Sequence, residues 1–141
     1  MKLIIAGSRS FTSYELLKFE VKKFIIEQNN RPALIISGTA RGADKLGERF
    51  ATEYGIPIDR WPAKWEELGI RAGLIRNEEM AQIATHCIVF WDGKSRGTKN
   101  MIDVAIKYNL TVKIVHFENP IHEITKRKNR RVEEILSSIV G

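Results

Sequence analysis

Three short segments combine glycine with a hydroxyl residue and an arginine, a set of residues suited to holding an anion. They are Gly7-Ser8-Arg9, the segment 37–44 (SGTARGAD) and the segment 91–98 (WDGKSRGT). Glycine lets the backbone approach a ligand closely, and the amides in the first turn of a helix lack partners within that helix. The helix dipole and the arginine add positive charge at the same place. If the three turns meet at one edge of a sheet, they predict a site for a phosphate-bearing ligand.

The residues that we expect to contact such a ligand come from these turns and from one later helix. They are Gly7, Ser8, Arg9, Ser37, Gly38, Thr39, Arg41, Gly42, Asp44, Arg76, Asn77, Gly93, Ser95, Gly97 and Thr98. None of the turns matches the dinucleotide fingerprint or the Walker loop, since the segment 38–42 lacks the Gly-Lys-Ser/Thr ending. A magnesium-nucleotide motor is therefore disfavoured.

Strands and helices alternate along the chain, and this order decides where the turns lie. Nearly continuous apolar runs predict strands over 2–6, 33–37 and 86–91, and a fourth run of β-type residues predicts a strand over 111–116. The alternating segment 56–61, which contains Pro57, predicts a strand at or near a sheet edge. Apolar residues at helical spacing predict helices over 13–28, 43–55, 70–84 and 98–109. The fold class is α/β: a Rossmann-like three-layer sandwich with a mostly parallel sheet of about five strands. Ligands bind beyond the carboxyl ends of such strands, where all three turns fall.

Composition indicates one domain of ordinary globular character. The chain has 141 residues, 43% of them hydrophobic, and a formal net charge of +6, which favours anionic partners. No apolar run approaches the roughly 20 residues that a membrane span needs, and no secretion signal is recognisable. A single cysteine, Cys87, excludes an internal disulfide and fits a cytoplasmic location. The three histidines lack metal-ligand spacing, and we expect neither metal nor cofactor.

The last part of the chain departs from the alternating pattern. We expect residues 1–117 to form the ligand-binding domain and 118–141 to form a basic segment and a C-terminal helix that packs on the domain or on a subunit partner. The run 126–131 is cationic, and apolar residues at helical spacing follow it. A solvated turn is one interpretation of this run, and contact with a nucleic-acid backbone is the other. No aromatic residue lies between the cations to stack on a base.

Four motifs in this order resemble a known family. Gly7-Ser8-Arg9, the segment 37–44, Arg76-Asn77-x-x-Met80 and Gly93-x-Ser-x-Gly-Thr98 are similar to those of the YspA/YpsA-related branch of the SLOG superfamily. That superfamily groups the Smf/DprA DNA-processing proteins with the LOG phosphoribohydrolases. The resemblance implies a Rossmann-like fold that binds a nucleotide-derived ligand, and proteins that commonly form homo-oligomers. It does not fix an activity, because a fold supports many functions.

One position departs from the enzymatic relatives. LOG hydrolases pair an arginine with a glutamate in Pro-Gly-Gly-x-Gly-Thr-x-x-Glu, and here Arg76 matches the arginine whereas Met101 occupies the glutamate position. Cleavage of an N-glycosidic bond needs a carboxylate, which Met101 does not supply. The candidate catalytic residues are therefore Arg76 with Asp44 or Asp92 as the substitute carboxylate, and the sequence leaves open whether the protein is an enzyme.

Three functions are compatible with these residues. The first is a binding protein or sensor for a nucleoside phosphate or an ADP-ribose-like molecule. In this binding function, phosphate is held by the amides of 38–44 and 93–98 together with Arg9, Arg41 and Arg76. Asp44 faces the ribose. The second is a nucleotide phosphoribohydrolase or related N-glycosidase. The third is a DNA-processing-associated module.

Several of these residues have a structural alternative. Asp44 could cap the second helix, and Arg76 could pair with Glu79 or Glu78. Similarly, Arg9, Arg41 and Arg96 could be solvated surface charges. Trp61 and Trp65 could clamp a long connection instead of stacking on a base, and Trp91 at the end of its strand has the same two interpretations.

Overall fold

The computed structural model describes residues 1–118 and contains one sheet with helices on both faces. The strands are β1 (Lys2–Gly7), β2 (Leu34–Ser37), β3 (Ile58–Arg60), β4 (His86–Trp91) and β5 (Thr111–His116). The helices are α1 (Tyr14–Gln28), α2 (Ala43–Glu53), α3 (Trp65–Leu68), the 3₁₀ turn η1 (Gly69–Arg71), α4 (Ala72–Ile83) and α5 (Arg96–Lys107). The predicted basic run 126–131 and the C-terminal helix lie outside the described residues.

The five strands are all parallel and lie in the order β3-β2-β1-β4-β5. This confirms the predicted Rossmann-like α/β fold, and it places the strand that follows Pro57 at an edge, as expected. The chain moves outward from β1 to β3 and then crosses to the other side of β1 to form β4 and β5. The strand order therefore reverses between β1 and β4, and ligands of open α/β sheets bind at such a point.

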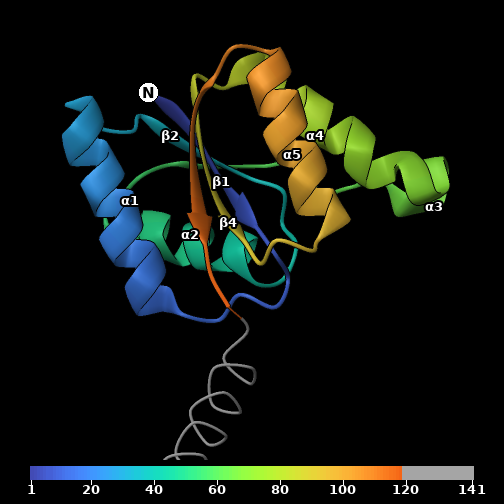
Figure 1. Ribbon diagram of the computed structural model, residues 1–141. Coiled ribbons are helices and arrows are strands. Elements are labelled where there is room, and N and C mark those ends of the chain that lie inside the picture. The colour runs from blue at the N-terminus through green and yellow to red at the C-terminus, as the bar shows by residue number, and fades with distance from the viewer. Residues whose placement is uncertain (119–141) are drawn as a thin grey trace, which may run out of the picture.

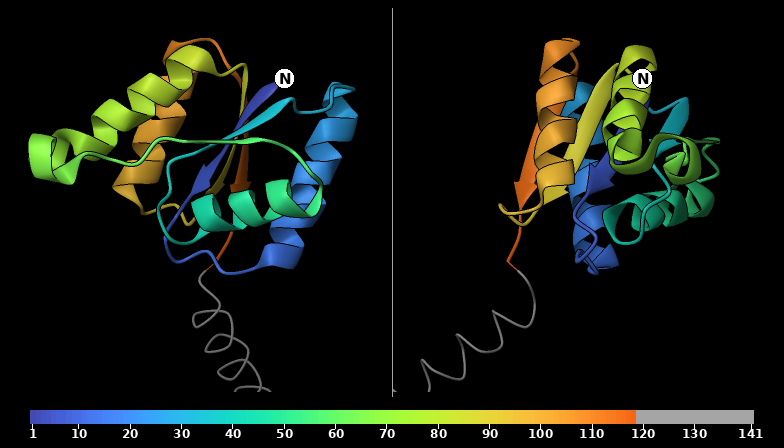
Figure 2. Two further views of the ribbon diagram at one scale, coloured as in Figure 1. Left: turned by 180° about the vertical axis from the view of Figure 1, so that it is seen from behind. Right: turned by 90° about the vertical axis from the view of Figure 1, so that its right-hand side faces the viewer.

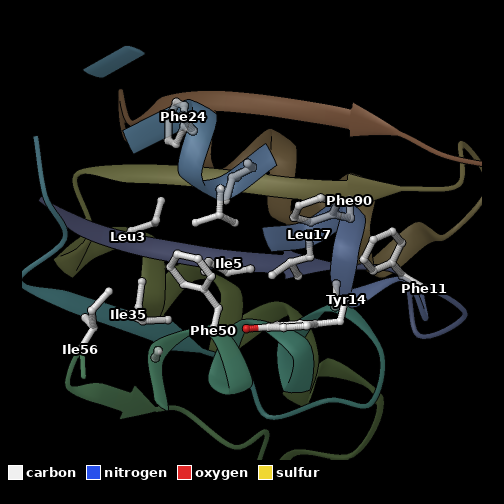
Figure 3. Packing of buried hydrophobic residues seen from close by; sticks show 14 residues of the cluster. Leu3, Ile5, Phe11, Tyr14, Leu17, Phe24, Ile35, Phe50, Ile56 and Phe90 are labelled. Carbon is white, nitrogen blue, oxygen red and sulfur yellow. The ribbon is translucent and has the colours of Figure 1, made fainter. Parts of the chain in front are cut away.

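Side chains of the central strands alternate between two hydrophobic layers. Leu3 and Ile5 of β1 face a cluster formed with α1 and α2, whereas Ile4 and Ala6 face a cluster formed with α4 and α5. Figure 1 shows α1 on one side of the sheet and α4 and α5 on the other, with α3 projecting beyond α4. Figure 3 shows the first cluster filled by side chains from the strands and both helices. Burial on both faces explains why β1 is a continuous apolar run.

Local capping fixes where the helices begin. The Ser13 hydroxyl accepts a hydrogen bond from the Leu16 amide at 3.2 Å, so α1 begins at Tyr14. Ser95 caps α5 in the same way, and the helix begins at Arg96, earlier than the apolar spacing indicated. The region 61–71 differs most from expectation, because α3 and η1 interrupt a segment in which we expected only a connection and the start of α4. Figure 2 shows this segment standing away from the sheet.

Within residues 1–118, no helix combines the length and the apolar character needed to cross a bilayer. The cytoplasmic location and the homo-oligomer stay predictions.

Close packing of α2 on β1 requires a glycine at position 47. A Cβ atom there would lie 2.7 Å from Cγ2 of Ile5, a side chain that is completely buried and cannot move aside. We expect Gly47→Ala to lower the free energy of unfolding by about 1–3 kcal/mol, since overpacking outweighs the better helix propensity of alanine. Urea denaturation measures this change.

The control is the same substitution at Gly97 in the first turn of α5, where a Cβ atom meets nothing within 4 Å. We expect Gly97→Ala to leave stability unchanged or to raise it by up to about 1 kcal/mol. Equal effects of the two substitutions would show that the packing of Gly47 on Ile5 is not tight.

Candidate functional site

A cleft of about 730 Å³ lies at the carboxyl ends of the strands, beside the point where the strand order reverses. Its volume is within the range of small-molecule sites. The structure brings residues of all three predicted turns together here with residues of α3, η1 and α4. The predicted residues that line it are Gly7, Ser8, Arg9, Arg41, Asp44, Arg76, Asn77, Ser95, Gly97 and Thr98, and Asp92 joins them.

Five predicted residues do not line the cleft, namely Ser37, Gly38, Thr39, Gly42 and Gly93. Gly38 lies directly behind the lining. A Cβ atom on it would come within 2.8 Å of both the Arg76 Nη1 and the Asp44 Oδ2 atoms. A glycine at this position therefore lets two cleft side chains pack against the backbone.

The turn after β2 has an unusual backbone. Thr39 has a φ of 66° and Gly42 a φ of 83°, both in the left-handed region. A β-branched residue is strained there, and strain of this kind gathers at functional sites. At position 42 a Cβ atom would also lie 2.5 Å from the Ser8 carbonyl oxygen, so the turn packs closely against the turn after β1.

A buried glutamate that the sequence reasoning missed supports this turn from behind. Glu48 of α2 is 7% exposed and accepts hydrogen bonds from the Ser37 hydroxyl and from Arg60 Nε, both at 2.8 Å. The Ser37 oxygen in turn accepts from the Thr39 amide at 3.1 Å. Burial alone would raise the pKa of Glu48. Hydrogen bonds from Arg60 and Ser37 and the charge of Lys45 outweigh this effect and lower the pKa below its usual value. Glu48 lies off the apolar positions Leu46, Phe50 and Tyr54 that predicted this helix, so they gave no signal for it.

Asp44 and Arg76 form the floor of the cleft. Asp44 is 5% exposed, and its Oδ2 accepts a hydrogen bond from the Ala40 amide at 3.1 Å. Burial raises the pKa of Asp44 from 3.8 to about 6, against the opposing effects of the Ala40 amide and the Arg76 charge. The N-cap of α2 is Gly42, so Asp44 lies within the first turn and does not cap the helix.

Arg76 is held in place by two acceptors. Its Nη1 donates to the Gly38 carbonyl oxygen, and its Nε donates to Asn77 Oδ1 at 3.1 Å. The alternative partner Glu78 instead accepts from Tyr108 and from a lysine of α5. Burial lowers the pKa of Arg76, an effect that the Asp44 carboxylate opposes. Arg76 therefore reaches across from α4 to the turn after β2.

Asp92 has a different role at the cleft edge. Its Oδ1 accepts hydrogen bonds from the Lys94 amide at 2.9 Å and from the Ser95 amide at 2.8 Å, and its own amide donates to the Ser8 hydroxyl. Burial alone would raise the pKa of Asp92, but these hydrogen bonds hold that pKa below its usual value. Asp92 is thus an ionised group that shapes the turn before α5.

Several amides that we expected to hold phosphate donate within their own turns. The amides of Thr39, Ala40 and Thr98 bind Ser37, Asp44 and Ser95 respectively. The positive charge of the cleft therefore depends more on arginine side chains than the sequence indicated.

Three arginines stand at the mouth of the cleft. Arg9, Arg41 and Arg96 are exposed, line the cleft, and form no ion pair within residues 1–118. Arg9 lies close enough to Arg76 to contribute to lowering the pKa of Arg76. Two guanidinium groups at this separation repel each other, and an anion between them would relieve the repulsion.

An apolar wall completes the cleft, and most of it was not predicted. Trp65 of α3, Ile70 of η1 and Leu74 of α4 line it, with exposed fractions of 50%, 94% and 47%. Trp65 was one of three candidates for a stacking wall, whereas Trp61 packs on the hydrophobic cluster beneath α4 and α5. Ile70 and Leu74 have helical spacing, which indicated a buried face. Trp91 is not in the lining, because its indole donates to the Ser95 carbonyl.

Among residues 1–118, no three histidine, cysteine, aspartate or glutamate side chains are grouped so that they could hold a metal ion.

The stability of the protein should depend on the charge of Asp44. A pKa of about 6 in the folded protein, against an ordinary 3.8, means that protonation favours folding. This contribution is complete below about pH 4 and is lost as the pH rises through about 6, at a cost on the order of 3 kcal/mol. We expect Asp44→Asn, which keeps an acceptor for the Ala40 amide, to be more stable than the unmodified protein at pH 8. Chemical denaturation of both proteins at pH 4.5 and pH 8 measures the difference.

The difference in stability should shrink at pH 4.5, where Asp44 is protonated in the folded protein. A stability advantage of Asp44→Asn that is the same at both values of pH would contradict the raised pKa. Asp103→Asn, on the exposed face of α5, controls for the loss of a carboxylate elsewhere.

The comparisons with known proteins agree with this fold. A family model described as "YspA, cpYpsA-related SLOG family" matches residues 1–67, which include the turns after β1 and β2 and Asp44. The "Gene 61 protein" of Mycobacterium phage D29 is 33% identical over 121 residues, which cover 79% of this chain and 93% of the phage protein. No solved structure gives a significant match.

Proposed function

Because the chain belongs to the YspA, cpYpsA-related SLOG family, whose members have nucleotide-related binding or processing roles, we propose that it binds a nucleotide-derived ligand in the cleft. A nucleoside phosphate or an ADP-ribose-like molecule is the ligand class that fits best. One observation carries this proposal: a single cleft joins arginines that form no ion pair within residues 1–118 to an exposed apolar wall. A nucleotide has the matching pair of features, an anionic phosphate and a flat base.

The phosphate binds at the mouth in this proposal. Arg9 and Arg41 extend from turns that pack against each other, and Arg76 lies behind Arg9. A phosphate held there accepts charge-assisted hydrogen bonds and screens the repulsion between Arg9 and Arg76. Arginine suits this role because its planar group donates two parallel hydrogen bonds to phosphate oxygens.

The base binds against the apolar wall. Trp65, Ile70 and Leu74 expose large apolar surfaces to the cleft, and an aromatic ring stacks well on an indole. Burial of these surfaces by a base removes apolar area from water, which stabilises the complex. The wall and the mouth both adjoin Arg76 of the floor, and in this proposal the sugar of the nucleotide binds over the floor.

Arg41→Ala tests the phosphate site. Calorimetry with AMP, ADP and ADP-ribose should give a dissociation constant at least about tenfold higher for the variant, because a charge-assisted hydrogen bond is worth about 1.5–3 kcal/mol. Binding should also depend less on salt concentration in the variant than in the unmodified protein.

Arg31→Ala is the matched control, since Arg31 is an exposed arginine that precedes β2 and lies away from the cleft. Its affinities should equal those of the unmodified protein. If none of these nucleotides binds below millimolar concentration, or if Arg41→Ala binds as tightly as Arg31→Ala, the proposal is wrong.

A second candidate function, hydrolysis of an N-glycosidic bond, is favoured by the environment of Asp44. Met101 lines the cleft at the position of the LOG glutamate, and Asp92 is occupied by two backbone amides. Asp44 is the remaining carboxyl group in the lining, and a pKa of about 6 suits proton transfer near neutral pH. In this reaction the bond between the sugar and the base breaks, water adds a hydroxyl group to the sugar carbon, and the base leaves with a proton.

Chromatography of nucleoside monophosphates after incubation with the protein tests this reaction. We expect release of free base, with a loss of at least about 100-fold in rate for Asp44→Asn. Intact nucleotides after long incubation would remove the hydrolase function and leave the binding function standing.

A further inference from the structure

Charge is distributed unevenly in the cleft, and this distribution restricts the ligand. Arginines 9, 41 and 96 are at the mouth, whereas the Asp44 carboxyl group is at the floor and almost completely buried. A phosphate is attracted to the arginines at the mouth, whereas at the floor the Asp44 carboxylate offsets the charge of Arg76. A nucleotide therefore enters in one orientation, with its phosphate at the mouth and its hydrogen-bond donors toward Asp44.

Asp44 is the carboxylate in the lining that has capacity for a ligand. An ionised carboxylate offers about four acceptor positions. Asp92 accepts from the amides of Lys94 and Ser95, and the Ser8 side chain and its own amide also hydrogen-bond to it. Asp44 accepts from the amides of Ala40 and Gly7, so about two of its acceptor positions remain for additional donors.

The floor adjoins both the apolar wall and the cationic mouth. A Cβ atom at Gly73 would be 3.4 Å from the Trp65 ring and 3.9 Å from Arg76 Nη2, so the wall adjoins the floor at this glycine. The floor also adjoins the mouth, because Arg9 is near enough to Arg76 to affect its pKa. In a nucleotide the sugar is likewise bonded to both the base and the phosphate.

We propose that Asp44 binds the hydroxyl groups of a ribose, so that the site selects ribonucleotides over 2′-deoxyribonucleotides. The proposal rests on the nucleotide-binding function and names the sugar. Hydroxyl groups donate to a carboxylate that is withdrawn from water, and a 2′-deoxy ligand leaves one acceptor position of that carboxylate desolvated without a donor. Discrimination follows from this unsatisfied acceptor position.

The experiment compares ribonucleotides with deoxyribonucleotides in three proteins. Calorimetry at pH 8 is carried out with the four ribonucleoside 5′-monophosphates and their 2′-deoxy counterparts, using the unmodified chain, Asp44→Asn and Asp103→Asn. We expect the unmodified chain to bind the ribonucleotide at least about tenfold more tightly than the matching deoxyribonucleotide. In Asp44→Asn the ratio should fall to within about threefold, whereas Asp103→Asn keeps the original ratio.

The ratio separates a contact with the sugar from a general effect on the fold, since a misfolded variant loses both ligands alike. Thermal unfolding of Asp44→Asn confirms that the variant is folded at the pH of the assay. If the unmodified chain binds both sugars equally, or if Asp44→Asn keeps the preference, the ribose contact is wrong and nucleotide binding stands. If the unmodified chain binds none of the eight nucleotides, the ribose contact and the monophosphate ligand are both wrong.

Discussion

The attraction between Asp44 and Arg76 is the interaction on which the candidate site depends. Neither group reaches the position alone: Asp44 comes from the first turn of α2, and Arg76 comes from α4 on the opposite face of the sheet. Both lie against the backbone of Gly38, where any larger residue would collide with both. A buried carboxylate and a half-buried guanidinium group thus lie at the carboxyl edge of the sheet, and each makes the burial of the other less costly.

The topology explains why this pair lies in a cleft and not in the core. After β1 the chain continues into α1 on one face of the sheet, and after β4 it continues into α5 on the other face, which leaves a crevice at the ends of these strands. Close packing of the turns after β1 and β2 closes one side of the opening, because Gly42 contacts the backbone of Ser8. The other side is formed by α3 and η1, which stand away from the sheet, and by α4, which packs on it (Figure 1).

The sequence predicted the scaffold well and the lining unevenly, for physical reasons. Strands buried on both faces are apolar throughout, so β1 and β4 could be recognised directly. The turns could be placed at one edge because parallel strands end there together. The apolar wall could not be predicted, because Ile70 and Leu74 have the spacing of a helix that packs on a core. Spacing does not reveal that the helix extends beyond the sheet. Likewise, burial of Glu48 depends on Arg60 from another strand, a contact that local sequence does not encode.

The charged groups in the cleft affect both the stability of the protein and the kind of ligand that the cleft binds. An ionised Asp44 destabilises the empty fold, and Arg9 and Arg76 repel each other at its side. Replacement of these acidic and basic groups by apolar ones would raise the stability of the protein. Their presence in one cleft therefore lowers stability, as is typical of functional sites. An apolar ligand would bury all of these charges without compensation. A ligand that is anionic at one end and rich in hydroxyl groups beside it satisfies the guanidinium groups and the carboxylate together, and this double requirement favours a phosphorylated sugar over a simple anion.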